Sequence, residues 1–193
     1  MPSLICFDLG NVLVRLKAHA RFESEPQKKE YQRLTQLYGL GALESTVFFT
    51  ALEHLFEWTW SLSDIESWFV HQRIEGLHPG AAALLGQLHD KGYTLALLSN
   101  INACHWAYLE RFGVFKLCDF RLLSFEQHCA KPDVPFYTRL ERLNVFAGAQ
   151  IIFFDDLAQN IEAARRLGWV TCQVSPDTAI DEIRAFLLKR DVL

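Results

Sequence analysis

Polar side chains follow several short apolar runs of this sequence. They are Asp8, the pair Ser99-Asn100, Lys131 and the pair Asp155-Asp156. In chain order they supply a carboxylate, a hydroxyl, an ammonium group and a second carboxylate. Two carboxylates suit a hard divalent cation such as Mg²⁺, which takes oxygen ligands. An ammonium and a hydroxyl group neutralise and hydrogen-bond phosphoryl oxygens, and the free oxygen of Asp8 has the chemistry to attack phosphorus. Together these groups predict a phosphate site built around a cation.

Each of these residues also has an ordinary structural explanation. An Asp, Ser or Asn after a strand is a common turn residue. Asp156 precedes a predicted helix and suits its N-cap, and Lys131 before Pro132 is typical of a solvated surface lysine. The set carries information only if the fold brings its members together, so the elements that would position them decide the matter.

Strand and helix patterns alternate from His78 to the end of the chain. Apolar strand patterns cover 93–98, 120–123, 150–154 and 169–174, and helical patterns cover 81–90, 103–112, 132–143, 158–167 and 178–189. Another strand pattern covers 3–7. Alternation of this kind predicts an α/β fold, a doubly wound parallel sheet with helices on both faces. In such sheets ligands bind beyond the carboxyl ends of the strands, where the polar residues above are expected.

The stretch between the first strand and this alternating part has a different texture. Helical patterns cover 28–38, 43–58 and 63–71, with no convincing strand, and Ser63 with Glu66 fits a capping box at the start of the last helix. We therefore expect an α/β core of residues 1–15 and 79–193 and a small inserted helical domain of residues 16–78.

These motifs resemble those of the haloacid dehalogenase-like (HAD) hydrolase superfamily over the whole chain. The matching segments are Phe7-Asp8-Leu9-Gly10-Asn11-Val12, Leu98-Ser99-Asn100, Lys131-Pro132, and Phe153-Phe154-Asp155-Asp156 with Asn160. The resemblance implies that the inserted helices form a cap domain. It implies that Asp8 is the nucleophile, that Ser99, Asn100 and Lys131 bind the phosphate, and that Mg²⁺ is held by Asp8, Asp156 and the Gly10 carbonyl. Asp155 and Asn160 would support the site.

Gly10 departs from the family pattern. Phosphatases of this superfamily usually carry a second Asp there as general acid and base, a role typically worth about 10²–10⁴-fold in rate. The Asp-Leu-Gly-Asn-Val version is similar to bacterial α-D-glucose-1-phosphate phosphatases, which points to a small phosphorylated metabolite, a sugar phosphate in particular. The alternative is a non-catalytic phosphate-binding or regulatory protein. Dehalogenases carry an aromatic residue at this position and use no metal, so the Asp155-Asp156 pair argues against that chemistry.

Composition excludes several other classes of protein. Of the 193 residues 50% are hydrophobic and 22% charged, which is typical of a globular chain. A formal net charge of −4 gives no general attraction for nucleic acid or anionic membranes, and no apolar run is long enough to span a bilayer. The five cysteines show no metal-ligand or disulfide spacing, so we expect reduced thiols and a cytoplasmic location.

Several further features have both a structural and a functional interpretation. The aromatic residues of the insertion fit the core of a helical domain, or one or two of them could wall the substrate pocket: Phe48, Phe49, Phe56, Trp58, Trp60, Trp68 and Phe69. The pairs Cys104-His105 and His128-Cys129 lack a third group and are not expected to form a thiol nucleophile. Arg15 fits a solvated arginine near the hinge of the insertion, and Asn11 and Asn102 are secondary candidates for the pocket.

Overall fold

The computed structural model describes residues 4–17, 22–144 and 150–193. Its main sheet has five parallel strands in the order β5-β4-β1-β6-β7. They are β1 (Leu4–Phe7), β4 (Thr94–Ser99), β5 (Phe120–Leu123), β6 (Ile151–Asp155) and β7 (Val170–Gln173). Because the chain builds outward from β1 first on one side and then on the other, the strand order reverses at β1. The doubly wound parallel sheet expected from the sequence is confirmed.

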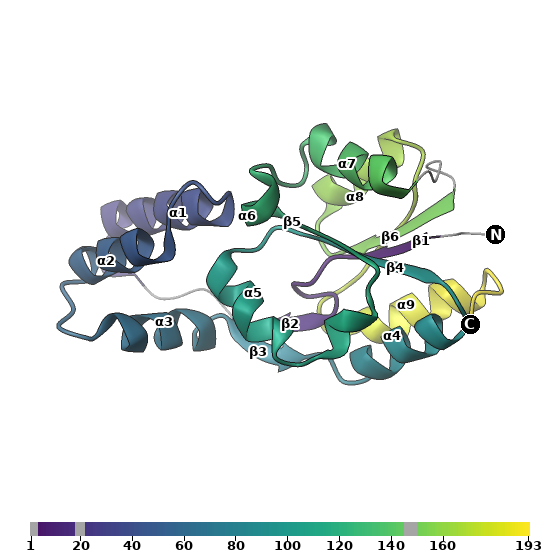
Figure 1. Ribbon diagram of the computed structural model, residues 1–193, viewed down its shortest axis with the longest axis horizontal. Helices are drawn as coiled ribbons and strands as arrows, with labels where there is room; N and C mark the ends of the chain where they lie inside the picture. Colours follow the sequence, from purple (N-terminus) through teal and green to yellow (C-terminus); the bar gives the residue numbers. More distant parts are fainter. Residues whose placement is uncertain (1–3, 18–21, 145–149) are drawn as a thin grey trace.

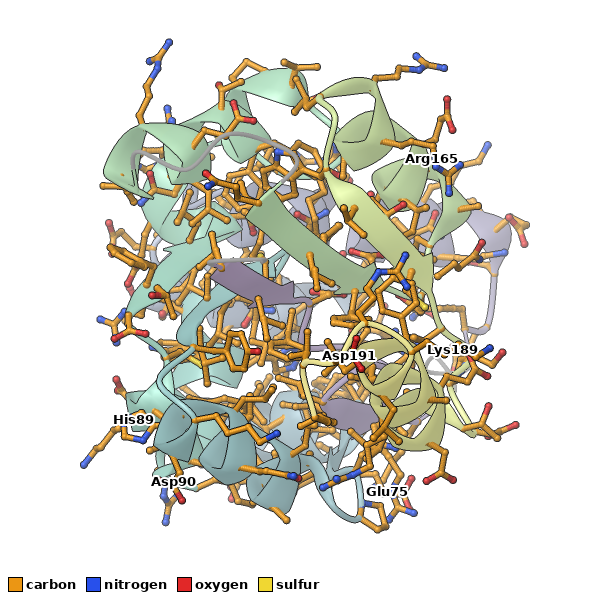
Figure 2. The ribbon with its side chains drawn as sticks, turned by 90° about the vertical axis from the view of Figure 1, so that its right-hand side faces the viewer. Glu75, His89, Asp90, Arg165, Lys189 and Asp191 are labelled. Atoms are coloured by element: carbon orange, nitrogen blue, oxygen red, sulfur yellow. The ribbon has the colours of Figure 1, made fainter. Side chains whose placement is uncertain are left out.

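Helices cover both faces of this sheet. The helices of the core are α4 (Ala81–Asp90), α5 (Ala103–Glu110), α6 (Ser124–Gln127), α7 (Val134–Asn144), α8 (Ala158–Arg166) and α9 (Ala179–Leu188), with a short 3₁₀ helix η1 (Val114–Leu117). Figure 1 shows α7 and α8 on one face and α4 and α9 on the other. Seen from the end where the termini lie, the sheet is the middle layer and the labelled charged side chains are exposed (Figure 2).

Alternate side chains of each strand point to opposite faces, which divides the core in two. In β1, Ile5 and Phe7 belong to the cluster under α4, α5 and α9, while Leu4 and Cys6 belong to the cluster under α7 and α8. Because both faces are covered, the strands read as unbroken apolar runs. Helix α4 ends as its sequence predicts: Gly92 has φ +81°, a conformation that glycine adopts without steric cost.

Three helices lie between β1 and the rest of the sheet in the sequence. They are α1 (Glu25–Gly39), α2 (Ser45–Leu55) and α3 (Leu62–His71), and Figure 1 places them at the end of the molecule opposite the marked termini. Rings of Tyr38, Phe48, Phe49 and Phe69 pack on one another, with Tyr38 and Phe48 stacked at 4.2 Å between centroids. These four rings thus form part of the core of this segment.

Two expectations for this segment are wrong. Strands β2 (Val14–Leu16) and β3 (Ile74–Leu77) flank the helices and pair antiparallel, although no strand was expected there. These strands are too short and irregular to show an alternating pattern, and pairing between distant segments forms them. Helix α3 is capped by Ser61, whose hydroxyl accepts a hydrogen bond from Asp64 N at 3.2 Å, so Ser63 is not the N-cap. The hydroxyl at 61 reaches the backbone amide of the next turn, as an N-cap must.

Differences elsewhere in the elements are small. The first strand begins at Leu4 in the described part of the chain, and the predicted start at Ser3 lies outside the described residues. The short helices η1 and α6 were not predicted, because four residues are too few for a helical period to show in a sequence. No helix in the described ranges has the length and hydropathy that a bilayer crossing needs. All five cysteines are unpaired.

Candidate active site

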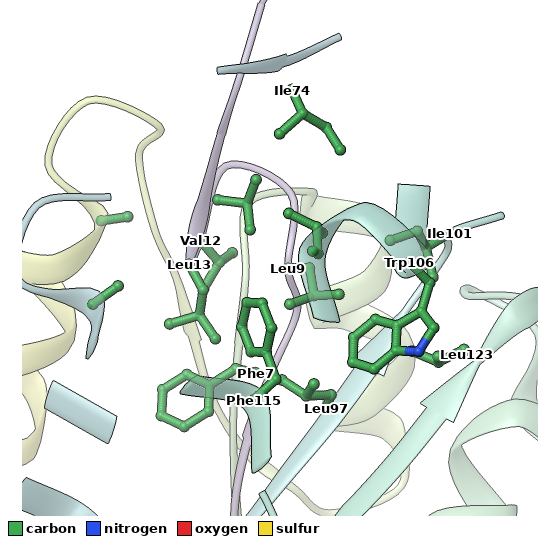
Figure 3. Close-up of a cluster of buried hydrophobic side chains, with 14 of the residues drawn as sticks. Phe7, Leu9, Val12, Leu13, Ile74, Leu97, Ile101, Trp106, Phe115 and Leu123 are labelled. Atoms are coloured by element: carbon green, nitrogen blue, oxygen red, sulfur yellow. The ribbon is translucent and has the colours of Figure 1, made fainter. Parts of the chain in front are cut away.

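The loop after β1 is held in place by apolar anchors. Leu9, Val12 and Leu13 are buried in the cluster shown in Figure 3, among strand residues such as Phe7 and Leu97. Burial of one such side chain is worth about 1.5–3 kcal/mol. The amides of Leu13 and Val14 both donate to the Leu9 carbonyl, at 3.0 and 2.8 Å. Because these anchors alternate with Asp8, Gly10 and Asn11, they fix the polar positions of the loop at the edge of the sheet.

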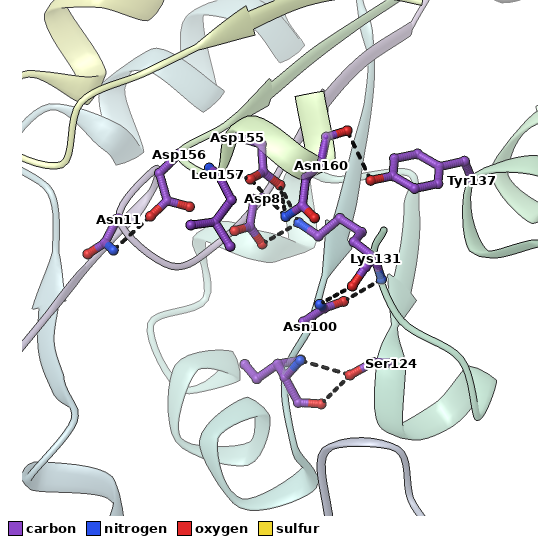
Figure 4. A network of polar contacts seen from close by, with 11 residues as sticks. Asp8, Asn11, Asn100, Ser124, Lys131, Tyr137, Asp155, Asp156, Leu157 and Asn160 are labelled. Atoms are coloured by element: carbon purple, nitrogen blue, oxygen red, sulfur yellow. Dashed lines mark hydrogen bonds and ion pairs between the residues drawn. The ribbon is translucent and has the colours of Figure 1, made fainter. Parts of the chain in front are cut away.

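Asp8, Lys131 and Asp155 form one buried chain of charges (Figure 4). Lys131 Nζ lies 2.9 Å from Asp8 Oδ1 and 2.6 Å from Asp155 Oδ2, and the lysine side chain is 1% exposed. Burial alone would lower the pKa of Lys131, but attraction to Asp8 and Asp155 outweighs it and raises that pKa. The lysine therefore stays protonated between the two carboxylates.

The surroundings of Asp8 disfavour its ionised form. Burial raises the pKa of Asp8 to about 6, and Asp155 adds to that rise; Lys131 and a hydrogen bond with Ser99 act in the opposite direction. The Asp8 amide donates to the Phe154 carbonyl at 2.9 Å, which ties the residue to the neighbouring strand β6. A carboxyl group desolvated in this way is a strong candidate for a functional role.

Asp155 is fully enclosed by donors. Besides Lys131, its carboxylate accepts hydrogen bonds from Leu157 N at 2.8 Å and from Asn160 Nδ2 at 2.9 and 3.1 Å. These contacts join Asp155 and Asn160 directly, and the supporting role that the family resemblance implies for them stays a prediction. Asp156 is half-buried, and its carboxylate accepts fewer hydrogen bonds than that of Asp155. Its Oδ2 accepts from Asn11 Nδ2 at 2.9 Å.

Three carboxylates are close enough to share a cation. One oxygen each from Asp8, Asp155 and Asp156 lies within 4.8 Å of the others. Since both oxygens of Asp155 already accept hydrogen bonds, Asp8 and Asp156 are the pair with oxygens to spare. An all-oxygen donor set of this kind fits Mg²⁺, which is usually bound by one or two carboxylates and keeps several waters.

Asn100 and Ser124 position the neighbouring loops. Asn100 Nδ2 donates to the Lys131 carbonyl and Asn100 Oδ1 accepts from the Lys131 amide, both at 2.8 Å. The Ser124 hydroxyl accepts from Ile101 N at 2.9 Å and lies 2.6 Å from the Gly39 carbonyl of α1, a contact between distant segments that the sequence did not reveal. Asn100 thus holds Lys131 in place, and its contact with a phosphate stays a prediction.

Two hollows meet at this site. A cavity of about 150 Å³ is lined by apolar residues and by Gly10, Arg73, Ser99, Asn100 and His105. A hollow of about 450 Å³ shares Asn100 with it and reaches Lys131. None of the seven aromatic residues singled out above lines either hollow. A larger hollow of about 610 Å³ lies along α1 and contains none of the predicted site residues.

The other candidates have structural roles. Burial raises the pKa of Cys104 to about 12, so its thiol is protonated and is no nucleophile. Arg15 forms an exposed ion pair with Glu75 at 2.9 Å. Asn102 caps α5 by accepting from His105 N at 2.9 Å, and it also lines the hollow of about 450 Å³. Sequence reasoning missed Leu16 and Arg73, which line the small cavity; no motif or period marks either residue.

Residues 2–168 match the family model for haloacid dehalogenase-like hydrolases. The chain belongs to this hydrolase family. It is 30% identical over 116 residues to a ribulose-1,5-bisphosphate 5-phosphatase of Halopiger xanaduensis, and the match covers 59% of this chain. It spans about half of that relative, 48% of its length.

Two solved structures of HAD proteins share the fold. A predicted HAD-like family hydrolase from Porphyromonas gingivalis superposes with a TM-score of 0.78 at 21% identity, covering 96% of this chain and 98% of that one. A HAD family enzyme from Bacteroides thetaiotaomicron, in complex with magnesium and inorganic phosphate, gives 0.75 at 19% identity over 90% and 94%. At such identities the likeness establishes the fold of this HAD hydrolase.

Proposed function

We propose that this HAD hydrolase is a Mg²⁺-dependent phosphatase acting on a small phosphomonoester, a sugar phosphate in particular. The observation that carries the proposal is the chain Asp8–Lys131–Asp155 beside Asp156, at the carboxyl edge of the sheet. The match to a curated phosphatase and the magnesium and phosphate held by a protein of the same fold support it. We also propose a cytoplasmic location, in keeping with the five unpaired cysteines.

Asp8 would act as the nucleophile. One carboxylate oxygen attacks phosphorus, the bond from phosphorus to the ester oxygen breaks, and an aspartyl phosphate forms. The departing alkoxide takes its proton from water, since residue 10 carries no acid. Lys131 and Ser99 would hydrogen-bond the phosphoryl oxygens and neutralise their charge. Water then attacks the phosphorus, which releases phosphate and restores Asp8.

Asp8, Asp156 and the Gly10 carbonyl would hold Mg²⁺. When bound, the ion neutralises negative charge on the phosphate and on the two carboxylates. Asp155 keeps Lys131 in position through the 2.6 Å ion pair, and Asn160 in turn fixes Asp155. Asn100 holds the Lys131 backbone from the other side.

The helices α1 to α3 would form a cap over this site. Residues 16–78 are proposed as the cap domain and residues 1–15 and 79–193 as the core. The small cavity lies where β2 and the α3–β3 junction face the loops after β1 and β4, with Leu16 and Ile74 on one side and Gly10 and Ser99 on the other. Movement of such a cap would admit substrate and exclude water during the reaction.

The rival proposal, a non-catalytic phosphate-binding protein, rests on Gly10 alone. A binding protein has no need of a nucleophile, and the chain retains Asp8 with its partner Lys131. Bacterial α-D-glucose-1-phosphate phosphatases, which the Asp-Leu-Gly-Asn-Val motif resembles, are compatible with the glycine because an anomeric oxygen is a good leaving group.

Turnover of a phosphomonoester panel with Mg²⁺ and with a chelator tests the proposed function. We expect hydrolysis that requires the cation and that falls to the uncatalysed background in Asp8→Asn, since an amide is neither a nucleophile nor an anionic ligand. Asp90→Asn, an exposed carboxylate at the end of α4, is the matched control and should keep wild-type rates. Wild-type turnover in Asp8→Asn would refute the covalent mechanism.

A further inference from the structure

Arg73 lies at the junction of α3 and β3 and lines the same cavity as Gly10, Ser99 and Asn100. The remaining lining residues are His105 and a set of apolar side chains: Leu9, Val14, Leu16, Ile74, Ile101 and Leu109. Arg73 is thus the charged member of this set. Asp156 is close enough to act on the pKa of Arg73 by its charge, which places the guanidinium within electrostatic range of the carboxylate cluster.

No carboxylate neutralises Arg73. In ranges 4–17, 22–144 and 150–193 its guanidinium forms no ion pair within 4.0 Å, and the remaining segments contain no Asp or Glu. Its recorded side-chain contact is a hydrogen bond from Nη1 to the Lys17 carbonyl at 2.5 Å. Asp156 Oδ2 instead accepts from Asn11. Arg15, on the neighbouring strand, differs because Glu75 pairs with it in solvent.

The positive charge of Arg73 is therefore not paired with a carboxylate. Burial lowers the pKa of its guanidinium by more than the charges of Tyr31 and Asp156 raise it, so the lost hydration is only partly compensated. A guanidinium has five N–H donors in a planar fork that matches carboxylate and phosphate oxygens. Within the described residues a single hydrogen bond, to the Lys17 carbonyl, leaves most of these donors available. An anion entering the cavity would supply the missing partner.

The cavity is also small. At about 150 Å³ it suits a compact ligand. Ser99, which hydrogen-bonds Asp8, marks one side of the cavity, and Arg73 is its charged lining residue on the side of the helical insertion.

We propose that Arg73 binds a second anionic group, carried on the alcohol part of the substrate, while the scissile phosphate lies at Asp8, Ser99 and Lys131. This inference rests on the proposed phosphatase function and narrows its substrate class to small phosphomonoesters that carry another carboxylate or phosphate. Arg73 then determines specificity, and neutral phosphomonoesters of the same size are poorer ligands.

Binding of matched phosphonates, which cannot be hydrolysed, tests this in the presence of Mg²⁺. Propylphosphonate, 3-phosphonopropionate and ethylene bisphosphonate share a two-carbon spacer and differ only at their far end, which is a methyl, a carboxylate or a phosphonate group. We expect wild-type protein to bind at least one of the doubly anionic ligands about 10- to 100-fold more tightly than propylphosphonate, the range of a hydrogen bond to a charged group. The preferred ligand identifies the second anion.

Variants assign the preference to a residue. Arg73→Gln should reduce the preference to near unity, Arg73→Lys should keep part of it, and Arg15→Gln should keep all of it. Equal binding of the three ligands by the wild type, or a preference that survives Arg73→Gln, would overturn the inference. Failure of the wild type to hydrolyse any phosphomonoester would instead contradict the proposed function, and the two failures are read from separate measurements.

Discussion

The Cδ1 methyl group of Leu16 lies 2.8 Å from the place that a β-carbon on Gly10 would take. Carbon atoms in good contact are about 3.5–4.0 Å apart, so Leu16 fills the space beside Gly10. Leu16 belongs to β2, a strand that the sequence did not predict, and both residues line the small cavity. The usual acid of HAD phosphatases is therefore replaced by an apolar contact.

Gly10→Asp should fold but lose stability. The added side chain pushes the flexible end of half-buried Leu16 aside, so we expect a loss near the lower end of the cost of overpacking, about 1 kcal/mol. Leu16→Ala in the same chain should return part of that loss, which a double-mutant cycle of urea unfolding measures as a coupling energy. Gly86→Asp on α4 meets no atom within 4 Å and serves as the control. Additive effects of the two substitutions would show that they do not meet.

The rate should depend steeply on the acidity of the leaving group. Without an acid at position 10 the departing oxygen takes no proton from that residue, and acid catalysis helps most when this oxygen is strongly basic. Aryl and anomeric sugar phosphates should exceed phosphates of primary alcohols in kcat by about 10²-fold. The Gly10→Asp, Leu16→Ala double variant should flatten this dependence. A flat dependence in the wild type would remove the reason for favouring a sugar 1-phosphate.

Asp155→Ala should lower folding stability, whereas Asp156→Ala should weaken Mg²⁺ binding. Asp155→Ala removes one of the two carboxylates paired with the buried Lys131 and leaves the Asn160 amide without its acceptor, and breaking a buried pair costs about 3–5 kcal/mol. Asp156→Ala removes a half-buried carboxylate bound to Asn11 and should weaken Mg²⁺ binding with little loss of stability. Thermal unfolding and magnesium titration of both variants check this, and the reverse order would refute the assignment of the ligands.

His105 should make folding sensitive to pH. Burial lowers the pKa of His105 to about 4. The hydrogen bond with the Phe69 carbonyl acts in the opposite direction, and the positive charge of Arg73 lowers the pKa further. Nε2 lies 3.1 Å from the Phe69 carbonyl and Nδ1 3.1 Å from Asn102 Nδ2, contacts that suit a neutral ring. The unfolded chain, with a His pKa of about 6.5, binds the proton first. The contribution of the neutral ring to the free energy of unfolding is therefore complete above about pH 6.5. It falls by about 2–3 kcal/mol as the pH falls towards 4.

His105→Gln tests this dependence. Its urea midpoint should fall less than that of the wild type between pH 7 and pH 4.5, although its stability at pH 7 is lower. The exposed His54, replaced in the same way, should leave the wild-type slope unchanged. Parallel slopes for His105→Gln and the wild type would show that the ring is protonated equally in both states.

The sequence by itself determined the sheet and the charged centre. Unbroken apolar runs of four to six residues can pair as buried parallel strands, and the polar residue after each run then has to lie at one edge. Asp8, Lys131, Asp155 and Asp156 could be named in advance because each stands next to a pattern with a local period. The resemblance to the HAD hydrolases rests on those same positions.

Only the tertiary structure decided what surrounds that centre. Strands β2 and β3 exist because Val14–Leu16 and Ile74–Leu77, far apart in the chain, pair with each other, and neither carries a period of its own. Their pairing brings Leu16 to Gly10 and Arg73 to the cavity. Contacts of this kind depend on chain closure over some sixty residues, and local patterns along a sequence cannot encode them.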